Sequence, residues 1–577
     1  MLKHKNNFHS TEIKFSVHFP RYEEGIVMWR FNLILIIIIC CYVTIALKLV
    51  ELGISGVGDQ VAILDMKRNK IVAINGDIAR ASIEDRNGVL LATNIMTSSI
   101  YARPKQFVDK AKAASSISQA IAGITEQQLL DKFFVEKEFV WIKRHITPEE
   151  QKRVHNLGIP GVYFVPDQKR FYPHENLCSH ALGYVDIDGN GLAGIERAYD
   201  SRLKNDASTL QLALDIRVQN IIKEELQHAI SLHNAVGGIG IMMDISTSEV
   251  VGMVSLPDFN LNKLNKTELK QSFNQATLAV NEMGSTFKIL TIASALDFGK
   301  IAVDEAFDVS QPIKVGKYTI HDYRGKGGVL SVPEILMYSS NLGVAQIARR
   351  LGIAKQREYL RKFGMLSPVT FDIGEVGKPL YPNEKRWSDV HLATISYGHG
   401  IAVTALHSVQ AMAAVVNGGL LHHPTLIKQA ENQNGETKRV LSNNTSLMMR
   451  KLLRLVVEYG SGKAANVPGY FVGGKTGTVE KVVNGRYSKH TNIALFMGAF
   501  PINDPRYVIF VAIDEAKNNQ VNKGFTTGGA IAAPAAGEII RKTANILDVL
   551  PQEQDDPEVA KQMFVEYTPR YKMLAKR

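Results

Sequence analysis

Cysteine is scarce in this chain: 577 residues contain three, and Cys40 and Cys41 stand together inside the longest apolar run. Cys178 is left alone outside that run, which excludes an intrachain disulfide framework and any zinc-type ligand spacing. Dense basic blocks and aromatic RNA-binding motifs are also missing, although the net charge is +11. We therefore expect no metal, no cofactor and no nucleic-acid partner, and the charge suits a membrane or cell-wall environment.

Long apolar runs are absent from the chain except for one. Residues 31–50 ("FNLILIIIICCYVTIALKLV") match a hydrocarbon core of roughly 30 Å at about 1.5 Å per residue. Basic residues are more frequent before this run than directly after it, so the positive-inside rule predicts a cytoplasmic tail (1–30), a membrane anchor (31–50) and an exported remainder. The alternative is a cleaved signal peptide, whose apolar region would be shorter and followed by small residues.

The exported part is too long for one hydrophobic core, so we expect at least two further domains. Residues 51–205 mix short strand-like segments with turn signals such as "DRNGV" and "DIDGNG", which indicates a mixed, loop-rich domain. No repeats of 20 to 50 residues are present.

Residues 206–550 have a different pattern. A helical pattern in "TLQLALDIRVQNIIKEELQHAI" leads into two strands, "GGIGIMMDI" and "EVVGMVSL", and helical patterns then run from 284 to about 460. Strand patterns return at "GYFVGGKTGTVE", and a helix closes the region. Strands at both ends with helices between them predict an α+β fold, an antiparallel sheet with an inserted helical subdomain. The charged end, 551–577, is expected to be a loosely held tail.

Three short motifs in this region suggest an active site: Ser285 to Lys288 in "NEMGSTFKIL", "SSN" at 339–341, and "KTGT" at 475–478. Alone, each has a structural explanation, since Ser285 could cap a helix and a lysine or threonine could simply face solvent. Ser-x-x-Lys and Ser-x-Asn each recur elsewhere in the chain, whereas Lys-Thr-Gly occurs once. The order and setting of all three favour the functional interpretation.

The chemistry of these residues fits acyl transfer by a serine. Residues three apart on a helix share a face, so Lys288 can reach Ser285 and act as its general base. At pH 7 only about 0.04% of a free lysine is neutral, so removing its proton costs roughly 4.6 kcal/mol. Burial beside a second cation such as Lys475 would lower the pKa of Lys288 and reduce this cost. Ser339 can relay a proton to a leaving amine, and Asn341 can hold a substrate peptide or Lys288.

The strand motif supplies groups for substrate binding. Thr476 and Thr478 point to one face of a strand and offer two hydroxyls to a substrate carboxylate. Gly477 would keep the strand bare for close substrate approach. The backbone N–H groups of Ser285 and Thr478 are expected to form an oxyanion hole, worth roughly 3 to 4 kcal/mol per donor.

Together the three motifs resemble those of penicillin-binding proteins and serine β-lactamases. The preceding domain is similar to the pedestal of class B penicillin-binding proteins in four segments, "RASIEDRNGVLLA" (80–92), "RFYP" (170–173), "HALGYVD" (180–186) and "GLAGIERAYDSRL" (191–203). This resemblance implies a D,D-transpeptidase that cross-links peptidoglycan stem peptides and is acylated by β-lactams. No glycosyltransferase-like segment precedes the pedestal, which argues against a bifunctional class A enzyme.

Within class B, "KRWSDVHLATISYGHGIAVTALH" (385–407) and "GKTGTVEK" (474–481) resemble the division-specific, septal type more than the elongation type. The resemblance implies a location at the division site of the inner membrane. It also implies two kinds of partner, a lipid-II polymerase of the shape, elongation, division and sporulation (SEDS) class and small divisome membrane proteins. Ala81, Met283 and Ala405 depart from usual family residues and concern local backbone shape.

Three alternatives stay open. An elongation-type class B enzyme would share every motif. A serine β-lactamase or D,D-carboxypeptidase would use the same residues and deacylate onto water, but the anchor and the large pedestal argue against it. A non-catalytic scaffold or β-lactam sensor would keep the fold, and the intact motifs argue against that.

Overall fold

The computed structural model describes residues 24–54, 79–323, 325–429, 437–483, 486–553 and 556–566, which fall into two compact units, Met1–Asp77 and Ile78–Arg577. The first contains helix α1 (Glu24–Ile54), whose large apolar side chains between Leu33 and Leu47 are exposed. Among the described residues, no helix combines the length and the apolar character needed to cross a membrane. Most of the predicted cytoplasmic tail, 1–23, lies outside the described residues.

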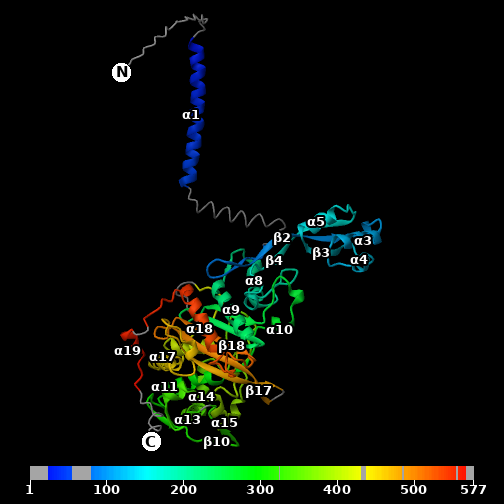
Figure 1. The fold of residues 1–577 in the computed structure, drawn as a ribbon. Helices are drawn as coiled ribbons and strands as arrows, with labels where there is room; N and C mark the ends of the chain where they lie inside the picture. Colours follow the sequence, from blue (N-terminus) through cyan, green and yellow to red (C-terminus); the bar gives the residue numbers. More distant parts are fainter. Residues whose placement is uncertain are drawn as a thin grey trace, which may run out of the picture. The chain divides into compact units, whose positions relative to one another are not determined.

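The second unit begins with a small mixed domain, as the turn-rich sequence predicted (Figure 1). Its sheet is centred on β2, which pairs antiparallel with β1, β3 and β4, and β5 extends the sheet by pairing parallel with β1. Helices α3 to α5 pack on β3 and on the adjoining ends of β2 and β4, around one apolar core. The bounds are β1 Ile83–Glu84, β2 Leu90–Ala102, α3 Lys110–Ala120, α4 Glu126–Phe133, β3 Val140–Ile146, α5 Pro148–His155, β4 Val162–Phe171 and β5 Leu210–Gln211.

Three of the four segments that resemble pedestal signatures meet at one buried carboxylate, that of Glu196. Its two oxygens accept hydrogen bonds from Nε of Arg80 and Nε of Arg170, each at 2.7 Å. Arg80 also donates to Asp200 at 2.6 Å. Glu196 is fully buried and both arginines are nearly so, which makes this network the centre of the domain's polar packing. The short helices α6 Ser179–Leu182, α7 Gly194–Ala198 and α8 Asp200–Asn205 surround it.

A second, larger sheet organises the C-terminal domain. Its five strands run antiparallel in the order β16-β17-β18-β6-β7, so strands from the two ends of the domain meet between β18 and β6. This is the α+β arrangement predicted from the sequence. The bounds are β6 Gly237–Asp244, β7 Val250–Leu256, β16 Gly473–Val483, β17 Arg486–Phe500 and β18 Tyr507–Asp514.

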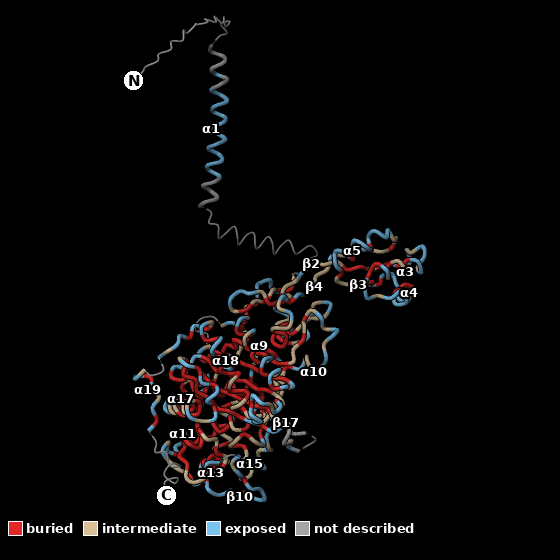
Figure 2. The backbone as a smooth tube through the Cα atoms, viewed as in Figure 1, coloured by how far each residue is buried: buried red, intermediate tan, exposed pale blue. Residues whose placement is uncertain are grey.

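Both faces of this sheet are covered by apolar cores, and the neighbouring strands β6 and β7 are buried along their whole length. Buried residues fill the interior of this domain (Figure 2). Side chains alternate between the faces because a strand has a period of two residues. Ile239 and Ile241 face the core that contains α11 and α16, whereas Met242 faces the core that contains α9 (Ile216–His233) and α18 (Ala532–Thr543). The sheet therefore separates two apolar layers, with Lys288 and Lys475 on the α11 side and the side chains of Thr476 and Thr478 on the other face.

The segment between β7 and β16 is mostly helical, again as predicted. Four two-stranded sheets, β8 with β13, β9 with β12, β10 with β11 and β14 with β15, connect its helices. The helices are α10 Leu269–Ser272, α11 Lys288–Asp297, α12 Val332–Met337, α13 Asn341–Leu351, α14 Ile353–Lys362, α15 Asp389–Ser396, α16 Ala405–Val416 and α17 Asn443–Glu458. The short strands are β8 Asn281–Glu282, β9 Ala306–Asp308, β10 Ile313–Val315, β11 Tyr318–Ile320, β12 Val329–Ser331, β13 Ala402–Val403, β14 Leu420–Leu421 and β15 Lys438–Arg439.

Two sequence expectations differ from the structure. The helical pattern placed at 209–230 begins only at Ile216, because Asp215 caps the helix and Leu210–Gln211 is the strand β5 of the first domain. The charged C-terminal end was expected to be loose. Its described part instead contains α19 (Pro557–Met563), which packs on α17 and buries Val559.

Candidate active site

The serine of the Ser-x-x-Lys motif lies in a tight turn that precedes the helix. Residues Gly284–Phe287 form a 3-10 helix, η3, and α11 begins directly afterwards at Lys288. Gly284 has a φ of +49°, in the left-handed region that favours glycine. Side chains three residues apart in a 3-10 helix lie one above the other, so Ser285 and Lys288 share one side of the turn. The predicted helix exists, but it starts at the lysine.

The turn is packed between two neighbours through contacts that leave no room for side chains. The N–H of Gly284 donates to the carbonyl of Gly398, and a Cβ on Gly398 would lie 2.2 Å from the oxygen of Gly284. On the other side, a Cβ on Gly477 of β16 would lie 3.0 Å from the carbonyl oxygen of Met283. From the sequence, Gly477 is expected to leave room for the substrate to approach the strand. In the structure, its missing side chain leaves room for the turn 284–287, here called the nucleophile turn because it carries the predicted nucleophile Ser285.

Lys288 is completely buried, and its ammonium is directed at the second motif. Nζ donates to the carbonyl oxygen of Ser339 at 2.5 Å and lies 3.0 Å from Oγ of the same residue. Burial holds the pKa of Lys288 well below its usual value, and the positive charge of Lys475 lowers it further, while Asp322 opposes both. The structure thus gives the lysine the environment that a neutral amine requires.

The backbone of Ser339 explains how its carbonyl reaches that lysine. Ser339 has a φ of +62°, a conformation that is uncommon for residues other than glycine. Ser339 lies between α12 and α13. The next residue, Ser340, caps α13 by accepting a hydrogen bond from the N–H of Gly343. The "SSN" motif therefore lies at the junction of two helices within the region where helical patterns were predicted.

Asn341, the first residue of α13, is oriented toward a neighbouring loop. Its side-chain Nδ2 donates to the carbonyl of His321 at 3.1 Å, and its backbone N–H donates to Asp322. Asp322 also accepts from Oγ of Ser340 at 2.7 Å and from the N–H of Leu342 at 3.0 Å, so it binds the N-terminus of α13 as helix-dipole electrostatics favour. Of the two partners proposed for Asn341 from the sequence, Lys288 makes no hydrogen bond with it among the described residues, since its ammonium bonds to Ser339 instead.

Sequence reasoning missed Asp322, and no motif marks it. Its bonds join it to residues 18 or more positions later, so its position depends on how the loop folds back onto α13. Asp322 acts on the site in two ways, by holding the α13 N-terminus beside Ser339 and by opposing the fall in the pKa of Lys288.

Lys475 on β16 is the second buried ammonium of the site. It is fully buried, and Nζ donates to the carbonyl oxygen of Thr476 at 2.9 Å. Burial lowers the pKa of Lys475 to about 7. Its charge is therefore partly lost at neutral pH, and when present it acts on Lys288.

The two threonines of the strand motif lie on the strand face opposite Lys475, as the period of two predicts. Thr476 is buried, and its Oγ1 donates to Oγ of Ser461 at 2.8 Å. Thr478 is exposed, and its Oγ1 accepts from the N–H of Gly528 at 3.1 Å. Their hydroxyls therefore have different surroundings, and only that of Thr478 belongs to an exposed residue.

The backbone of Thr478 faces the nucleophile turn. A Cβ on Gly284 would lie 3.1 Å from the carbonyl oxygen of Thr478. In an antiparallel sheet the N–H and C=O of one residue point to the same side of the strand. Because β16 is at the edge of its sheet, the N–H of Thr478 is directed to the side on which Ser285 lies.

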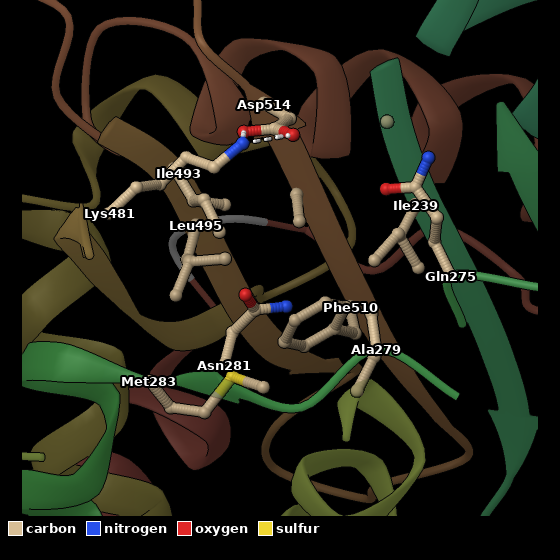
Figure 3. A pocket seen from close by; sticks show the side chains of 13 residues that line it. Ile239, Gln275, Ala279, Asn281, Met283, Lys481, Ile493, Leu495, Phe510 and Asp514 are labelled. Atoms are coloured by element: carbon tan, nitrogen blue, oxygen red, sulfur yellow. Dashed lines mark hydrogen bonds and ion pairs between the residues drawn. The ribbon is translucent and has the colours of Figure 1, made fainter. Parts of the chain in front are cut away.

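A cavity of about 190 Å³ lies next to the turn, against the sheet strands β6, β17 and β18 (Figure 3). Met283, Asn281 and Phe510 lie together at one end, and the ion pair between Lys481 and Asp514 borders the other end. Its lining includes none of the motif serines or lysines, so this cavity lies behind the nucleophile turn. Among the described residues, no group of three or more His, Cys, Asp or Glu could hold a metal ion.

Comparison with known families matches both domains. Residues 238–541 match the family "Penicillin binding protein transpeptidase domain", and residues 77–231 match "Penicillin-binding Protein dimerisation domain". The first range includes η3, α11 and β16, and the second includes the Glu196 network.

Curated relatives and solved structures are similar over most of the chain. A probable peptidoglycan D,D-transpeptidase FtsI of Caulobacter vibrioides is 37% identical over 82% of each chain. The probable peptidoglycan D,D-transpeptidase PenA of Neisseria meningitidis is 31% identical, over 82% of this chain and 85% of the relative. Penicillin binding protein 3 of Mycobacterium tuberculosis in its apo form has a TM-score of 0.66 at 25% identity, covering 82% of this chain and 98% of that one.

Proposed function

We propose that Ser285 is the acylated nucleophile of this chain, which belongs to the penicillin-binding protein transpeptidase family and carries both domains of a class B member. The protein is a serine D,D-transpeptidase of the division type, which cross-links peptidoglycan stem peptides and is a target of β-lactams. The observation that carries the residue assignment is the bonding of buried Lys288 to Ser339, beside the turn that presents Ser285.

In the acylation step, Oγ of Ser285 attacks the carbonyl carbon of the penultimate D-alanine, and its proton passes to neutral Lys288. The new Oγ–C bond gives a tetrahedral intermediate. The C–N bond to the terminal D-alanine then breaks, and the leaving nitrogen takes the proton from Lys288 through the hydroxyl of Ser339. The 3.0 Å separation of Nζ and Oγ supports this relay, because it is within hydrogen-bond distance.

Two backbone donors stabilise the negative charge that forms on the carbonyl oxygen. We assign these donors to the N–H groups of Ser285 and Thr478. The support is the packing of Gly284 against the carbonyl of Thr478 and the edge position of β16. Donors held in advance at such positions contribute roughly 3 to 4 kcal/mol each.

The strand motif binds the donor peptide. Thr478, exposed on β16, offers its hydroxyl to the terminal carboxylate of the stem peptide, and Lys475 adds positive charge when it is protonated. Thr476 supports the strand through its bond to Ser461. Asn341 is assigned to the substrate peptide, with its amide oxygen available because its Nδ2 is bound to the loop carbonyl of His321.

The acyl-enzyme is resolved by an amine from a neighbouring stem peptide. That nitrogen attacks the ester carbonyl and gives up a proton to Lys288, the Oγ–C bond breaks, and Oγ of Ser285 takes this proton from Lys288. The products are a cross-linked peptide and free enzyme. A β-lactam enters the same first step, but its leaving nitrogen stays attached to the acyl group, so the ester persists.

We place the protein in the inner, cytoplasmic membrane, with the N-terminus cytoplasmic and both folded domains outside. The support is the apolar run 31–50 together with the exposed apolar side chains along α1, which water solvates poorly. At about 1.5 Å per residue, the apolar run 31–50 of the sequence matches a hydrocarbon core of roughly 30 Å. A location at the division site follows from the septal type.

Two further assignments extend the family relationship. We infer a SEDS-class glycan polymerase and divisome membrane proteins as partners, since the division type must act on newly polymerised strands. We also propose a division into pedestal (51–205), transpeptidase domain (206–550) and tail (551–577). The pairing of β5 with β1 supports one change: the boundary between pedestal and transpeptidase domain moves into the loop between Gln211 and Ile216.

A fluorescent penicillin tests the assignment of Ser285. The wild-type chain becomes covalently labelled, and Ser285→Ala does not, because no other hydroxyl occupies the turn position. A matched control is Ser201→Ala, which removes the serine of the other Ser-x-x-Lys pair, in α8, and leaves labelling unchanged. Labelling of Ser285→Ala at the wild-type rate would show that another residue is acylated.

A further inference from the structure

The cavity behind the nucleophile turn has room for one aromatic ring with a small substituent. Its volume is about 190 Å³. A dry cavity of about 150 Å³ lined by leucine, isoleucine and phenylalanine is known to bind benzene. Here the large apolar side chains of the lining are all more than nine-tenths buried; they are Ile239, Met283, Ile493, Leu495 and Phe510. The space therefore suits an apolar ring and leaves volume for a group attached to it.

The polar groups of the cavity differ in how far their hydrogen bonds are satisfied. Gln275 donates through Nε2 to a backbone carbonyl at 2.9 Å, and Lys481 bonds to both oxygens of Asp514 at 3.0 Å. The backbone of Asn281 pairs with β13, but its side-chain amide makes no hydrogen bond within the part of the chain that the structure describes. Figure 3 shows this amide directed into the cavity. Because an amide offers N–H donors and a carbonyl acceptor, Asn281 can bind one polar group of a ligand.

The other end of the cavity disfavours a negatively charged ligand. Nζ of Lys481 also bonds to Oε1 of Glu515 at 2.9 Å, so one ammonium there faces two carboxylates, those of Asp514 and Glu515. The three groups together carry an excess of negative charge, which repels an anion and leaves a neutral molecule unaffected. The side chains of Lys481 and Asp514 are 29% and 19% exposed, so solvent reaches this end of the cavity.

Met283 connects the cavity to the nucleophile turn. Its side chain lines the cavity, and its carbonyl oxygen accepts hydrogen bonds from Thr286, from Oγ1 at 2.7 Å and from the N–H at 3.3 Å. Neither Ser285 nor Lys288 is among the lining residues. A molecule in the cavity therefore touches the residue that leads into the turn, and it leaves the reacting groups free.

We propose that this cavity is a second ligand-binding site, which takes a small neutral aromatic molecule carrying a carboxamide. The ring packs against the apolar side chains of β17 and β18, and the carboxamide exchanges two hydrogen bonds with the amide of Asn281, one in each direction. Because the site is separate from the reacting groups, its ligand and a penicillin can occupy the same chain together.

The test is a calorimetric titration of the detergent-solubilised full chain with benzamide at about pH 7.5. For a molecule of this size we expect a Kd of about 0.1 to 1 mM. Benzoate has the same shape but carries a negative charge and no N–H donor, so it should bind at least about ten-fold more weakly. Equal binding of the two compounds would overturn the proposal.

Two variants test the residues that line the cavity. Asn281→Leu keeps a side chain of similar size but removes the amide, so benzamide should bind about ten-fold more weakly. The matched control is Asn265→Leu, at an exposed position in the 3-10 helix η2 (Leu264–Lys266), which should bind benzamide as the wild type does. Ala512→Leu places a larger side chain in the cavity and should abolish binding, and it carries the comparison if Asn281→Leu does not fold.

Acylation by penicillin before the titration shows where benzamide binds. The acylated chain should have a Kd within about two-fold of that of the free chain, because the two ligands occupy separate sites. Loss of binding on acylation would place benzamide at the reacting groups and overturn the proposal. So would a wild type that does not bind benzamide, or unchanged binding in both Asn281→Leu and Ala512→Leu. A chain that penicillin does not acylate would instead contradict the proposed role of Ser285, while the comparison of variants still decides the cavity.

Discussion

Lys288 and Lys475 are buried ammonium groups that act on each other within one site. Each has a folded-state pKa below its unfolded value, so the folded chain binds fewer protons than the unfolded chain. The cost to stability is full below the folded pKa, about 7 for Lys475, and disappears as pH rises toward 10.5. The same burial favours the neutral amine that the proposed role of Lys288 as a base requires, so reactivity and stability oppose each other here.

The charge of Lys475 should be visible in the pH profile of acylation. Below pH about 7, where Lys475 is protonated, its charge helps burial to keep Lys288 neutral. In Lys475→Met the pKa of Lys288 should rise, moving the acidic limb of the acylation rate to higher pH and lowering the rate near pH 6 by about ten-fold or more. Labelling rates across pH for the two chains measure this.

The control for that change is Lys463→Met, which removes an exposed lysine from a short 3-10 helix. Its acidic limb should coincide with that of the wild type. If the limb of Lys475→Met also stayed in place while only the rate fell, Lys475 would act on substrate binding rather than on the base.

At this scale the sequence predicted which motif residues lie close together better than it predicted the residues around them. Ser285, Lys288 and Lys475 belong to short motifs with regular spacing, and the structure brings Lys288 under the influence of Lys475. Asp322 could not be found in this way, because its position depends on a loop that folds back onto α13. The left-handed backbone of Ser339 could not be predicted either, because it arises where α12 ends and α13 begins.

Between elements, the contact of η3 with β16 decides where the nucleophile lies. A Cβ on Gly477 would approach the carbonyl of Met283 to 3.0 Å and Thr286 to 3.2 Å. Gly477→Ala should therefore displace the turn by a few tenths of an ångström and reduce acylation about ten-fold or more, with a smaller effect on unfolding. Labelling rate and thermal unfolding measured on the same preparation separate the two effects.

Gly374→Ala offers a matched glycine, since a Cβ there meets nothing within 4 Å. It should change neither rate nor unfolding temperature appreciably. Wild-type acylation by Gly477→Ala would mean that the turn adjusts without cost, and the packing argument for Ser285 would then be wrong.

The elements themselves were predictable where periodicity is strong. The pair β6 and β7 follows from two apolar runs around a short turn, and the inserted helices follow from their spacing. The boundaries of the elements were less predictable. Leu210–Gln211 belongs to the same apolar pattern as the helix that follows, and it becomes a strand only by pairing with β1. For α19, the charged sequence did not indicate the contact with α17 that orders it.

Across the whole molecule, the pedestal depends on a buried ionic centre as much as on apolar packing. Removing Glu196 leaves two nearly buried arginines, Arg80 and Arg170, without their shared carboxylate. Glu196→Ala should destabilise the pedestal by about 3 to 5 kcal/mol and expose it to proteases, while labelling of Ser285 by penicillin persists. Limited proteolysis combined with labelling measures both outcomes.

The comparison is Glu358→Ala, which removes a carboxylate paired with two lysines on the surface of α14 and 41% exposed. Such exposed pairs contribute little to stability because water screens them, so proteolysis should be unchanged. Equal resistance of both variants would show that the arginines find other acceptors and that the network does not support the domain.

The edge position of β16 has a consequence for how inhibitors can be evaded. A ligand that lies extended along an edge strand bonds to main-chain N–H and C=O groups, which every amino acid except proline supplies alike. Selection for antibiotic resistance cannot delete these groups by changing side chains on the strand. Escape has to come from altered backbone shape or from slower entry, and both would also burden a natural substrate that binds along the same edge.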